Sequence, residues 1–183
     1  MNVVRLVKKA KRGNKEALLQ LIMAEKDDYY RLALTYTGNA HDAMDVMEEM
    51  IVKLYENIDQ LKKEEAFYSW SKTILVNRCK SYLLKRNKLV LFEDWNATNE
   101  KEIDNAPIID PYRNSDQQMD IQALLLLVNE YQKEAIQLKY LHDFDYQTIA
   151  EMTNVSIGTV KSRVFQGLKI LREHYRGDVD ENS

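Results

Sequence analysis

Apolar residues recur at helical spacing along most of the chain. The clearest stripe lies between residues 41 and 55, where apolar side chains follow one another at steps of three and one. This spacing has the period of a helix that turns one face toward a core. Similar stripes predict helices over residues 2–12, from residue 14, over 26–37 and over 66–88. The members of the clearest stripe are Ala43, Val46, Met47, Met50, Ile51 and Leu54.

Helical spacing is lost between residues 93 and 118, which contain both prolines, and it resumes near Met119. The later part has apolar stripes of its own, formed by Ile121, Leu124, Leu125 and Val128 and then by Ala135, Ile136, Leu138 and Leu141. We therefore expect an all-α protein with two small helical domains joined by a flexible acidic linker. The predicted parts are a first domain at 1–92, a linker at 93–118, a second domain at 119–176 and a tail at 177–183.

Charge is segregated along the chain, although the net charge is only −3. Residues 71–92 hold six basic side chains and no acidic one, whereas residues 93–120 hold eight acidic and two basic ones. Such asymmetry is typical of a protein that binds nucleic acid and carries an acidic connector.

Several functional classes find no support in the sequence. The single cysteine, Cys79, excludes an internal disulfide and a cysteine-rich zinc site, and its helical surroundings indicate a small core residue. The three histidines are scattered, and the chain lacks the motifs of metalloproteases, hydrolases and phosphate-binding loops. No metal or small cofactor is implied. Without a signal peptide or an apolar run of membrane-spanning length, the chain is expected to be soluble and cytoplasmic.

Residues 145–172 carry the pattern of a helix-turn-helix. Asp145 and Ser156 are residue types that cap helix N-termini, and Asn154 tolerates the left-handed conformation that such a turn requires. Ile149 points inward from the first helix. The second helix has a buried side formed by Val160, Val164, Leu168 and Leu171. An ordinary helical hairpin with a solvated basic face would share this pattern, but the two caps and the basic second helix favour DNA binding.

The early turns of the second helix carry the side chains that would read DNA. A recognition helix presents these turns to base edges in the major groove, where Arg and Lys pair with guanine and Gln with adenine. The candidate contacts are Thr159, Lys161, Ser162, Arg163 and Gln166.

Three stretches resemble the sigma-70 family, in its small extracytoplasmic-function group. Residues 42–58 resemble the acidic helix of the family's region 2, and residues 67–86 resemble the aromatic and basic helix that follows it. Residues 140–173 are similar to region 4. The likeness covers residues 29–88 and 119–174. It implies a transcription initiation factor that binds core RNA polymerase and promoter DNA.

The resemblance also implies roles for particular residues. The acidic helix of region 2 docks on the clamp of the largest polymerase subunit, and the matching polar face here consists of Asp45, Glu48, Glu49 and Lys53. The basic helix lies on the promoter −10 element, with contacts from Asn77, Arg78, Lys80, Ser81, Lys85 and Arg86. The loop 57–65 would help to form a pocket for an extruded base. Phe67 and Trp70 could stack on bases, but at this spacing a core position is favoured.

Region 4 would place its recognition helix on the −35 element. The chain departs from the family pattern there, because Gln166, Gly167 and Leu168 replace a frequent Arg-Ala-Arg. A glycine inside a helix costs about 1 kcal/mol relative to alanine. Other departures are Met44, Glu48, Ile51 and Ser81. They leave the class intact and bear on which promoter is preferred.

Alternative interpretations make different predictions. A helix-turn-helix regulator that acts without core polymerase would share the C-terminal pattern but would not need the acidic helix followed by a basic one. An enzyme has no support in the sequence, and an interaction-only helical protein would not need a basic recognition helix. Members of the resembled group are usually held inactive by an anti-sigma factor, often a membrane-bound one, so such a partner is expected.

Overall fold

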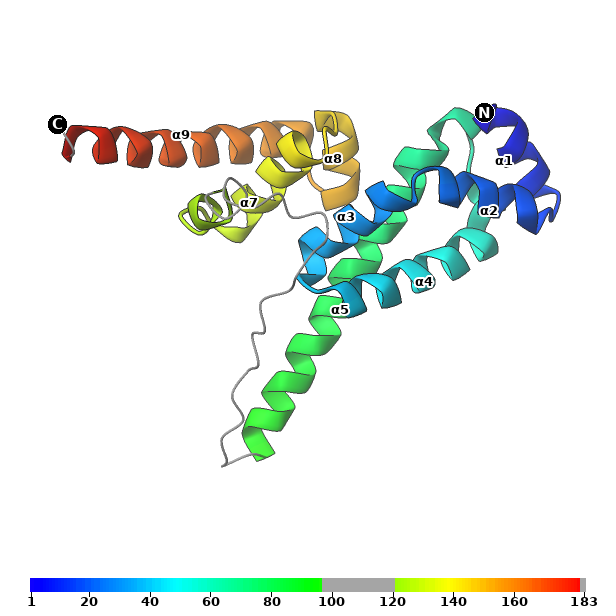
Figure 1. Ribbon diagram of the computed structural model, residues 1–183, viewed down its shortest axis with the longest axis horizontal. Helices are drawn as coiled ribbons and strands as arrows, with labels where there is room; N and C mark the ends of the chain where they lie inside the picture. Colours follow the sequence, from blue (N-terminus) through cyan, green and yellow to red (C-terminus); the bar gives the residue numbers. More distant parts are fainter. Residues whose placement is uncertain (97–120, 182–183) are drawn as a thin grey trace. The chain divides into compact units, whose positions relative to one another are not determined.

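The computed structural model describes residues 1–96 and 121–181, with side chains described for 1–88 and 121–177. The chain forms two compact units, Met1–Ile108 and Ile109–Ser183 (Figure 1). Every regular element in the described residues is helical, which confirms the predicted all-α fold. The predicted linker at 93–118 lies outside the described residues except for its first four. No helix in the described part of the chain is long and apolar enough to cross a membrane.

The first unit is built from five helices that begin and end close to the predicted positions. They are α1 (Val3–Lys11), α2 (Lys15–Ala24), α3 (Lys26–Thr37), α4 (Ala40–Asn57) and α5 (Phe67–Asn96). Asparagine side chains at 2, 14 and 39 cap the starts of α1, α2 and α4. Gly38 ends α3 in the left-handed conformation, with a φ of 76°.

Helix α5 runs further than the sequence pattern predicted. Its backbone stays helical to Asn96, whereas the prediction ended the helix at Lys88 and assigned residue 93 onward to the linker. Residues 89–96 contain neither glycine nor proline, so nothing in them stops a helix that is already formed. Loss of apolar periodicity therefore does not mark the end of this helix.

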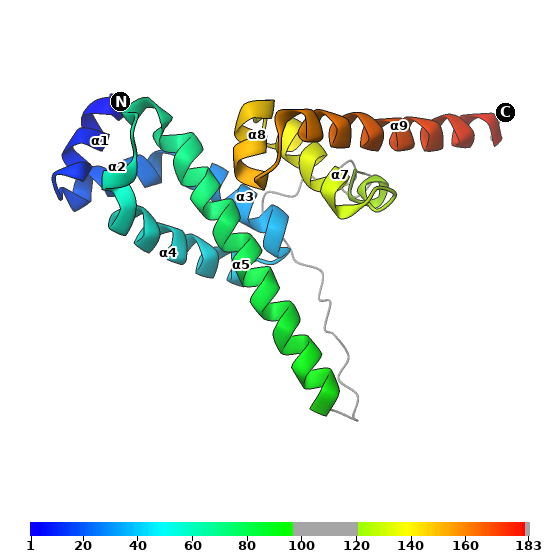
Figure 2. The same cartoon turned by 180° about the vertical axis from the view of Figure 1, so that it is seen from behind.

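The core of the first unit lies where α3, α4 and α5 pack against one another (Figure 2). Cys79 is fully buried there, which confirms it as a core residue, and burial raises the pKa of its thiol to about 12. The largest fully buried side chains of these three helices are Tyr29, Leu32, Val46, Met50, Leu54, Phe67 and Leu75.

Polar contacts cross this core and tie α5 to α3. The Lys72 ammonium lies 2.6 Å from a carboxylate oxygen of Glu25, at the start of α3, and the Lys72 side chain is only 13% exposed. The hydroxyls of Tyr29 and Ser71 share a hydrogen bond of 2.7 Å. Burial raises the pKa of the Tyr29 hydroxyl well above its usual value, so it stays protonated.

The connection between α4 and α5 is more ordered than its polar sequence suggested. It forms two short 3-10 turns, η1 (Ile58–Gln60) and η2 (Glu64–Ala66). Ile58 and Leu61 are buried. The Lys11 ammonium of α1 donates to the Leu61 carbonyl at 2.6 Å and to the Glu64 carboxylate at 3.2 Å. The first helix thus holds this connection in place.

The second unit is a smaller helical bundle. A helical stretch at 121–125 is followed by α7 (Glu130–Ile136), the π-helical segment η3 (Gln137–Leu141), α8 (Tyr146–Thr153) and α9 (Ile157–Glu181). Helix α9 continues into the residues that the prediction assigned to a tail. Ile121 and Leu141, expected in the core, are exposed. One core cluster consists of Leu125, Val128 and Ile136, packed against Leu168 and Leu171.

Gly167 has a packing role that its helix propensity did not suggest. It faces α7, and a Cβ atom there would lie 2.6 Å from Cδ1 of Ile136 and 3.2 Å from Cβ of Gln132. Helix α9 therefore approaches α7 closely because this residue has no side chain. Glycine lowers the stability of a helix because its backbone has more freedom to lose. In return, its missing side chain lets the two helices pack closely.

Candidate nucleic-acid and polymerase interfaces

The helix-turn-helix has the local geometry that the sequence predicted. The Asp145 carboxylate accepts a hydrogen bond from the Thr148 backbone N–H at 2.7 Å, and this bond helps to lower the pKa of the carboxyl. Asn154 adopts the left-handed conformation with a φ of 56°. The Ser156 hydroxyl oxygen accepts from the Thr159 backbone N–H at 3.1 Å and caps α9. Both predicted caps and the predicted turn are confirmed.

Helix α9 presents one side to the core and another to solvent. Val160 and Val164 are buried, and Leu168 and Leu171 are half-buried on the same side, as predicted. The predicted DNA contacts occupy the remaining surface in two groups. Lys161, Ser162 and Gln166 are exposed, whereas Thr159 and Arg163 are half-buried at the edge of the surface.

The exposed surface of α9 includes a residue that sequence reasoning missed. Phe165 is 70% exposed and lies one helical turn from Ser162 and from Lys169. A large aromatic side chain that leaves the core on this helix adds an apolar surface beside its polar and basic residues. The sequence could have predicted its exposure, because Phe165 lies off the buried stripe formed by Val160, Val164 and Leu168.

Two cations of α9 lie over tyrosine rings from other elements. The Lys161 ammonium is 5.7 Å from the centroid of the Tyr146 ring at the start of α8. The Arg163 guanidinium is 4.7 Å from the centroid of the Tyr131 ring on α7. Lys139 of η3 approaches the Tyr146 ring as well, at 4.9 Å. These are cation–π contacts, which restrain a cation without neutralising its charge.

The predicted −10 contacts on α5 do not all share one face. Asn77, Ser81 and Lys85 recur at intervals of four and therefore line one side of the helix, with Arg78 beside them. Asn77 and Lys85 are exposed, whereas Arg78, Lys80 and Ser81 are half-buried.

Arg86 lies on another side of α5 and is engaged within the protein. Its guanidinium donates to the Asp42 carboxylate at the start of α4, at 2.9 Å. Burial alone would raise the pKa of Asp42, but hydrogen bonds from Asn39 and Tyr82 and the charge of Arg86 outweigh that effect and lower the pKa. Arg86 therefore ties α5 to the start of α4.

The two aromatic residues at the start of α5 belong mainly to the core. Phe67 is fully buried, and Trp70 is half-buried with its ring centroid 6.2 Å from that of Phe67. The core position favoured by the sequence is confirmed for Phe67. Trp70 keeps part of its ring at the surface.

The predicted polymerase-binding residues lie together on α4. Asp45, Glu48 and Glu49 are exposed, and Lys53 is half-buried with its ammonium 2.6 Å from Glu56. Beside the acids runs an apolar strip that the sequence analysis did not identify, formed by Met44, Ile51, Val52 and Tyr55, all exposed.

The prediction for Ile51 was therefore wrong, because it placed this residue in the buried stripe. Ile51 stands seven residues after Met44 and four before Tyr55, a spacing that would have revealed a second stripe on α4. An exposed apolar strip beside acidic side chains is the composition of a surface that docks on another protein.

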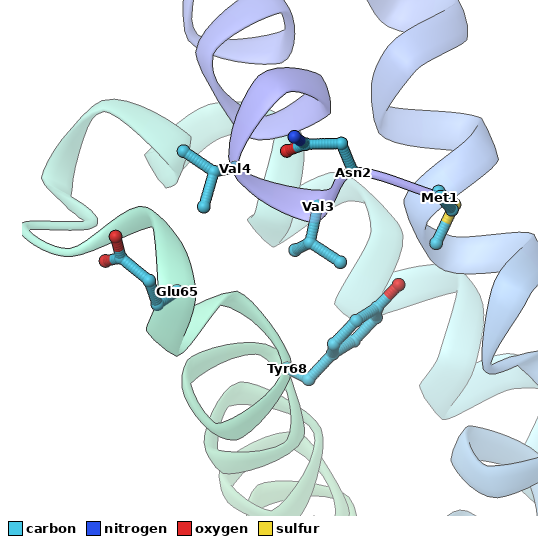
Figure 3. A pocket seen from close by; sticks show the side chains of 6 residues that line it. All are labelled: Met1, Asn2, Val3, Val4, Glu65 and Tyr68. Carbon is cyan, nitrogen blue, oxygen red and sulfur yellow. The ribbon is translucent and has the colours of Figure 1, made fainter.

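An open pocket lies at the start of α1, next to η2 and α5 (Figure 3). Its walls are largely hydrocarbon, and the Tyr68 hydroxyl in it donates to the Leu21 carbonyl at 3.3 Å. The six lining residues are Met1, Asn2, Val3, Val4, Glu65 and Tyr68.

Comparison with known protein families matches both units. Residues 21–89 match sigma-70 region 2, and residues 118–171 match sigma-70 region 4. These ranges contain α3, α4, most of α5, α8 and the first part of α9, which carry the candidate interfaces.

Curated relatives match over nearly the whole chain. RNA polymerase sigma factor SigV of Bacillus subtilis is 32% identical, over 90% of this chain and 94% of the relative. The ECF RNA polymerase sigma factor SigW of the same organism is 26% identical, over 96% of this chain and 98% of its own length.

Solved structures agree with this relationship. The sigma factor RpoE of Bartonella quintana, solved in complex with the anti-sigma factor NepR, is 25% identical with a TM-score of 0.66. The match covers 86% of this chain and 95% of that one. CnrH, solved with the cytosolic domain of CnrY, shares the fold with a TM-score of 0.66 at 17% identity. The chain belongs to the sigma-70 family of RNA polymerase sigma factors, in its extracytoplasmic-function group.

Proposed function

We propose that the two units of this sigma factor divide promoter recognition between them. Residues 1–92 bind core RNA polymerase and the −10 element, and residues 119–176 bind the −35 element. The observation that carries this division is the pairing of a capped helix-turn-helix in one unit with an acidic, apolar-edged helix in the other. The chain acts as a dissociable, non-enzymatic subunit of the polymerase in the cytoplasm.

Helix α4 supplies the polymerase contact. Asp45, Glu48 and Glu49 face solvent. On the same helix, His41 approaches Asp45 at 3.7 Å, and the Lys53 ammonium pairs with Glu56 rather than with these three acids. Exposed acids of this kind complement a basic partner surface, and the neighbouring apolar strip supplies area that becomes buried on docking.

Helix α5 supplies the −10 contact. Asn77, Ser81, Lys85 and Arg78 form the polar and basic face that meets the displaced strand, together with Lys80 and Arg86 at its sides. Initiation requires unpaired bases, and an extruded base needs a pocket flanked by phosphate-binding cations. The connection 57–65 precedes α5, and the hydrogen bonds that Lys11 donates to it restrain its conformation.

Helix α9 supplies the −35 contact through Thr159, Lys161, Ser162, Arg163 and Gln166. Its early turns are capped, exposed and basic, which suits insertion into the major groove. Each well-formed bidentate contact to a base discriminates by roughly 1–3 kcal/mol.

Run-off transcription with core polymerase on a pool of promoter fragments tests the proposal. The wild-type chain should give a defined set of start sites, and core polymerase alone should not. Reversing the charges of Lys161 and Arg163 should abolish promoter-specific initiation but leave core binding in a pull-down unchanged. An equal loss of core binding would contradict the division of labour.

The same pull-down separates this function from that of a regulator acting without polymerase, because a sigma factor binds core enzyme in the absence of DNA. An anti-sigma factor is a further proposed partner. The relative RpoE was solved in complex with one, and the acidic and apolar surface of α4 is open to such a partner when polymerase is absent.

A further inference from the structure

The two cations in the early turns of α9 flank its exposed face on opposite sides. Successive residues of a helix are turned by about 100° from one another. Ser162 and Gln166 therefore point away from the core, while Lys161 and Arg163 lie to either side of them. Arg163 lies on the edge nearest α7, one helical turn before Gly167, which faces Ile136 of α7.

The contact between Arg163 and Tyr131 is not a core contact. The guanidinium lies 4.7 Å from the ring centroid, and Tyr131 is 64% exposed. Within residues 121–177, the Arg163 guanidinium makes this cation–π contact, and no carboxylate lies within ion-pair distance of it. The ring therefore restrains the cation at the surface rather than burying it.

A ring and a carboxylate differ in whether they occupy the N–H donors of an arginine. A ring face accepts no N–H···O hydrogen bond of ordinary strength, so a guanidinium held over a ring keeps donors for a phosphate, which can accept two of them at once. A carboxylate would occupy the same donors. The side chain also starts with less rotamer freedom to lose, so less entropy opposes binding.

We propose that Tyr131 is a positioning residue that holds Arg163 ready to bind a backbone phosphate at one edge of the major groove. A helix in the groove turns the middle of its exposed face toward the bases and its flanks toward the two backbones. Arg163 occupies a flank, so it contributes affinity that does not depend on the base sequence. The proposal rests on the proposed function, since it takes α9 as the helix that enters DNA.

A double-mutant cycle in the full chain tests the pair. The variants are Tyr131→Leu, Tyr131→Phe, Arg163→Ala and the combination of Tyr131→Leu with Arg163→Ala. The probe is a short fluorescent duplex of mixed sequence, because a phosphate contact acts on any sequence, and its anisotropy is followed over a range of low salt concentrations. Tyr131→Leu should weaken binding about two- to fivefold, the size of an exposed cation–π contact, and Tyr131→Phe should bind like the wild type.

Two readouts separate a positioning role from a structural one. Arg163→Ala should reduce the slope of log affinity against log salt by about 0.9, the loss of one phosphate contact. In the Arg163→Ala background, Tyr131→Leu should have no further effect. Tyr140→Leu is the matched control, since Tyr140 is 57% exposed in the same unit, and it should leave binding unchanged.

Three results would overturn the proposal: an equal loss from Tyr131→Leu in both backgrounds, an unchanged salt slope in Arg163→Ala, or no binding of the wild-type chain at low salt. Run-off transcription and the core pull-down decide the proposed function independently. A chain that selects start sites but shows no coupling in the cycle would refute the positioning role alone.

Discussion

Helices α5 and α9 hold their cations in different ways. On α5, Lys72 and Arg86 are paired with carboxylates from elsewhere in the first unit, at 2.6 Å and 2.9 Å, although Lys72 also lies 6.0 Å from the centroid of the Tyr29 ring. In the early turns of α9, Lys161 and Arg163 lie over tyrosine rings. A carboxylate uses the donors of its partner and ties two helices together, whereas a ring leaves the donors free. If the proposed function holds, the paired cations on α5 serve the fold first, and the ring-held cations on α9 serve DNA binding.

The largest effect is expected from removing the charge of Lys72. Lys72→Met leaves the Glu25 carboxylate, which is largely covered, without its cation, and breaking a buried pair costs roughly 3 kcal/mol or more. Lys161→Met, the same change at a ring-held cation, should alter the free energy of unfolding by less than about 0.5 kcal/mol. Urea unfolding followed by circular dichroism measures both. Equal losses would remove the distinction between the two helices.

The next largest effect concerns the close packing of α9 against α7 in the second unit. Gly167→Leu places a side chain where even a Cβ would meet Ile136, and overpacking of this kind costs about 2 kcal/mol. Gly158→Leu on the same helix is the control, since a Cβ there would meet only the Ser156 hydroxyl, at 3.8 Å. If the two variants unfold at the same urea concentration, close packing at Gly167 does not matter.

A smaller effect, in the first unit, should depend on pH. The pKa of Asp42 is lowered in the folded protein, so its carboxylate stabilises the fold above the unfolded pKa and loses this contribution as the pH falls through the folded value. Asp42→Asn should therefore lower the stability at neutral pH, by less than about 1 kcal/mol because Arg86 is half exposed. The difference from the wild type should shrink below about pH 4. A difference that stays constant with pH would exclude the ion pair as its cause.

The smallest effect concerns the salt dependence of DNA binding when the carboxylate that pairs with Arg86 is removed. Asp42→Asn frees the Arg86 guanidinium, so the salt slope for binding single-stranded DNA should steepen, by at most about 0.7 for one added phosphate contact. Anisotropy titrations with a short mixed-sequence single strand measure the slope. A shallower slope than that of the wild type would show that Asp42 holds Arg86 in place for DNA rather than away from it.

Local chemistry made the helix-turn-helix and most helix boundaries predictable. Asp145, Asn154 and Ser156 act on their immediate neighbours, so their identities determine their conformations. The clearest apolar stripe likewise placed Ala43 and Met50 in the core correctly.

Contacts between distant residues were not predictable in the same way. The pairing of Arg86 with Asp42 joins residues 44 positions apart, and the cation–π contact of Arg163 with Tyr131 joins two helices. The sequence contains the residues but not their proximity. Gly167 is an example. Helix propensity predicts only that it destabilises α9, whereas its role in close packing depends on α7 lying against it. Exposure of Ile51 was missed because two stripes on α4 overlap in sequence.

Cys79 offers a way to watch the first unit open without altering the protein. It is the only cysteine of the chain, it lies fully inside the packed helices, and its thiol has a pKa of about 12. A thiol reagent attacks the thiolate, so modification has to await an opening that brings the sulfur into water. The rate of alkylation in the unmodified chain therefore reports how often α5 separates from its neighbours, and a bound polymerase that clamps the unit should slow it.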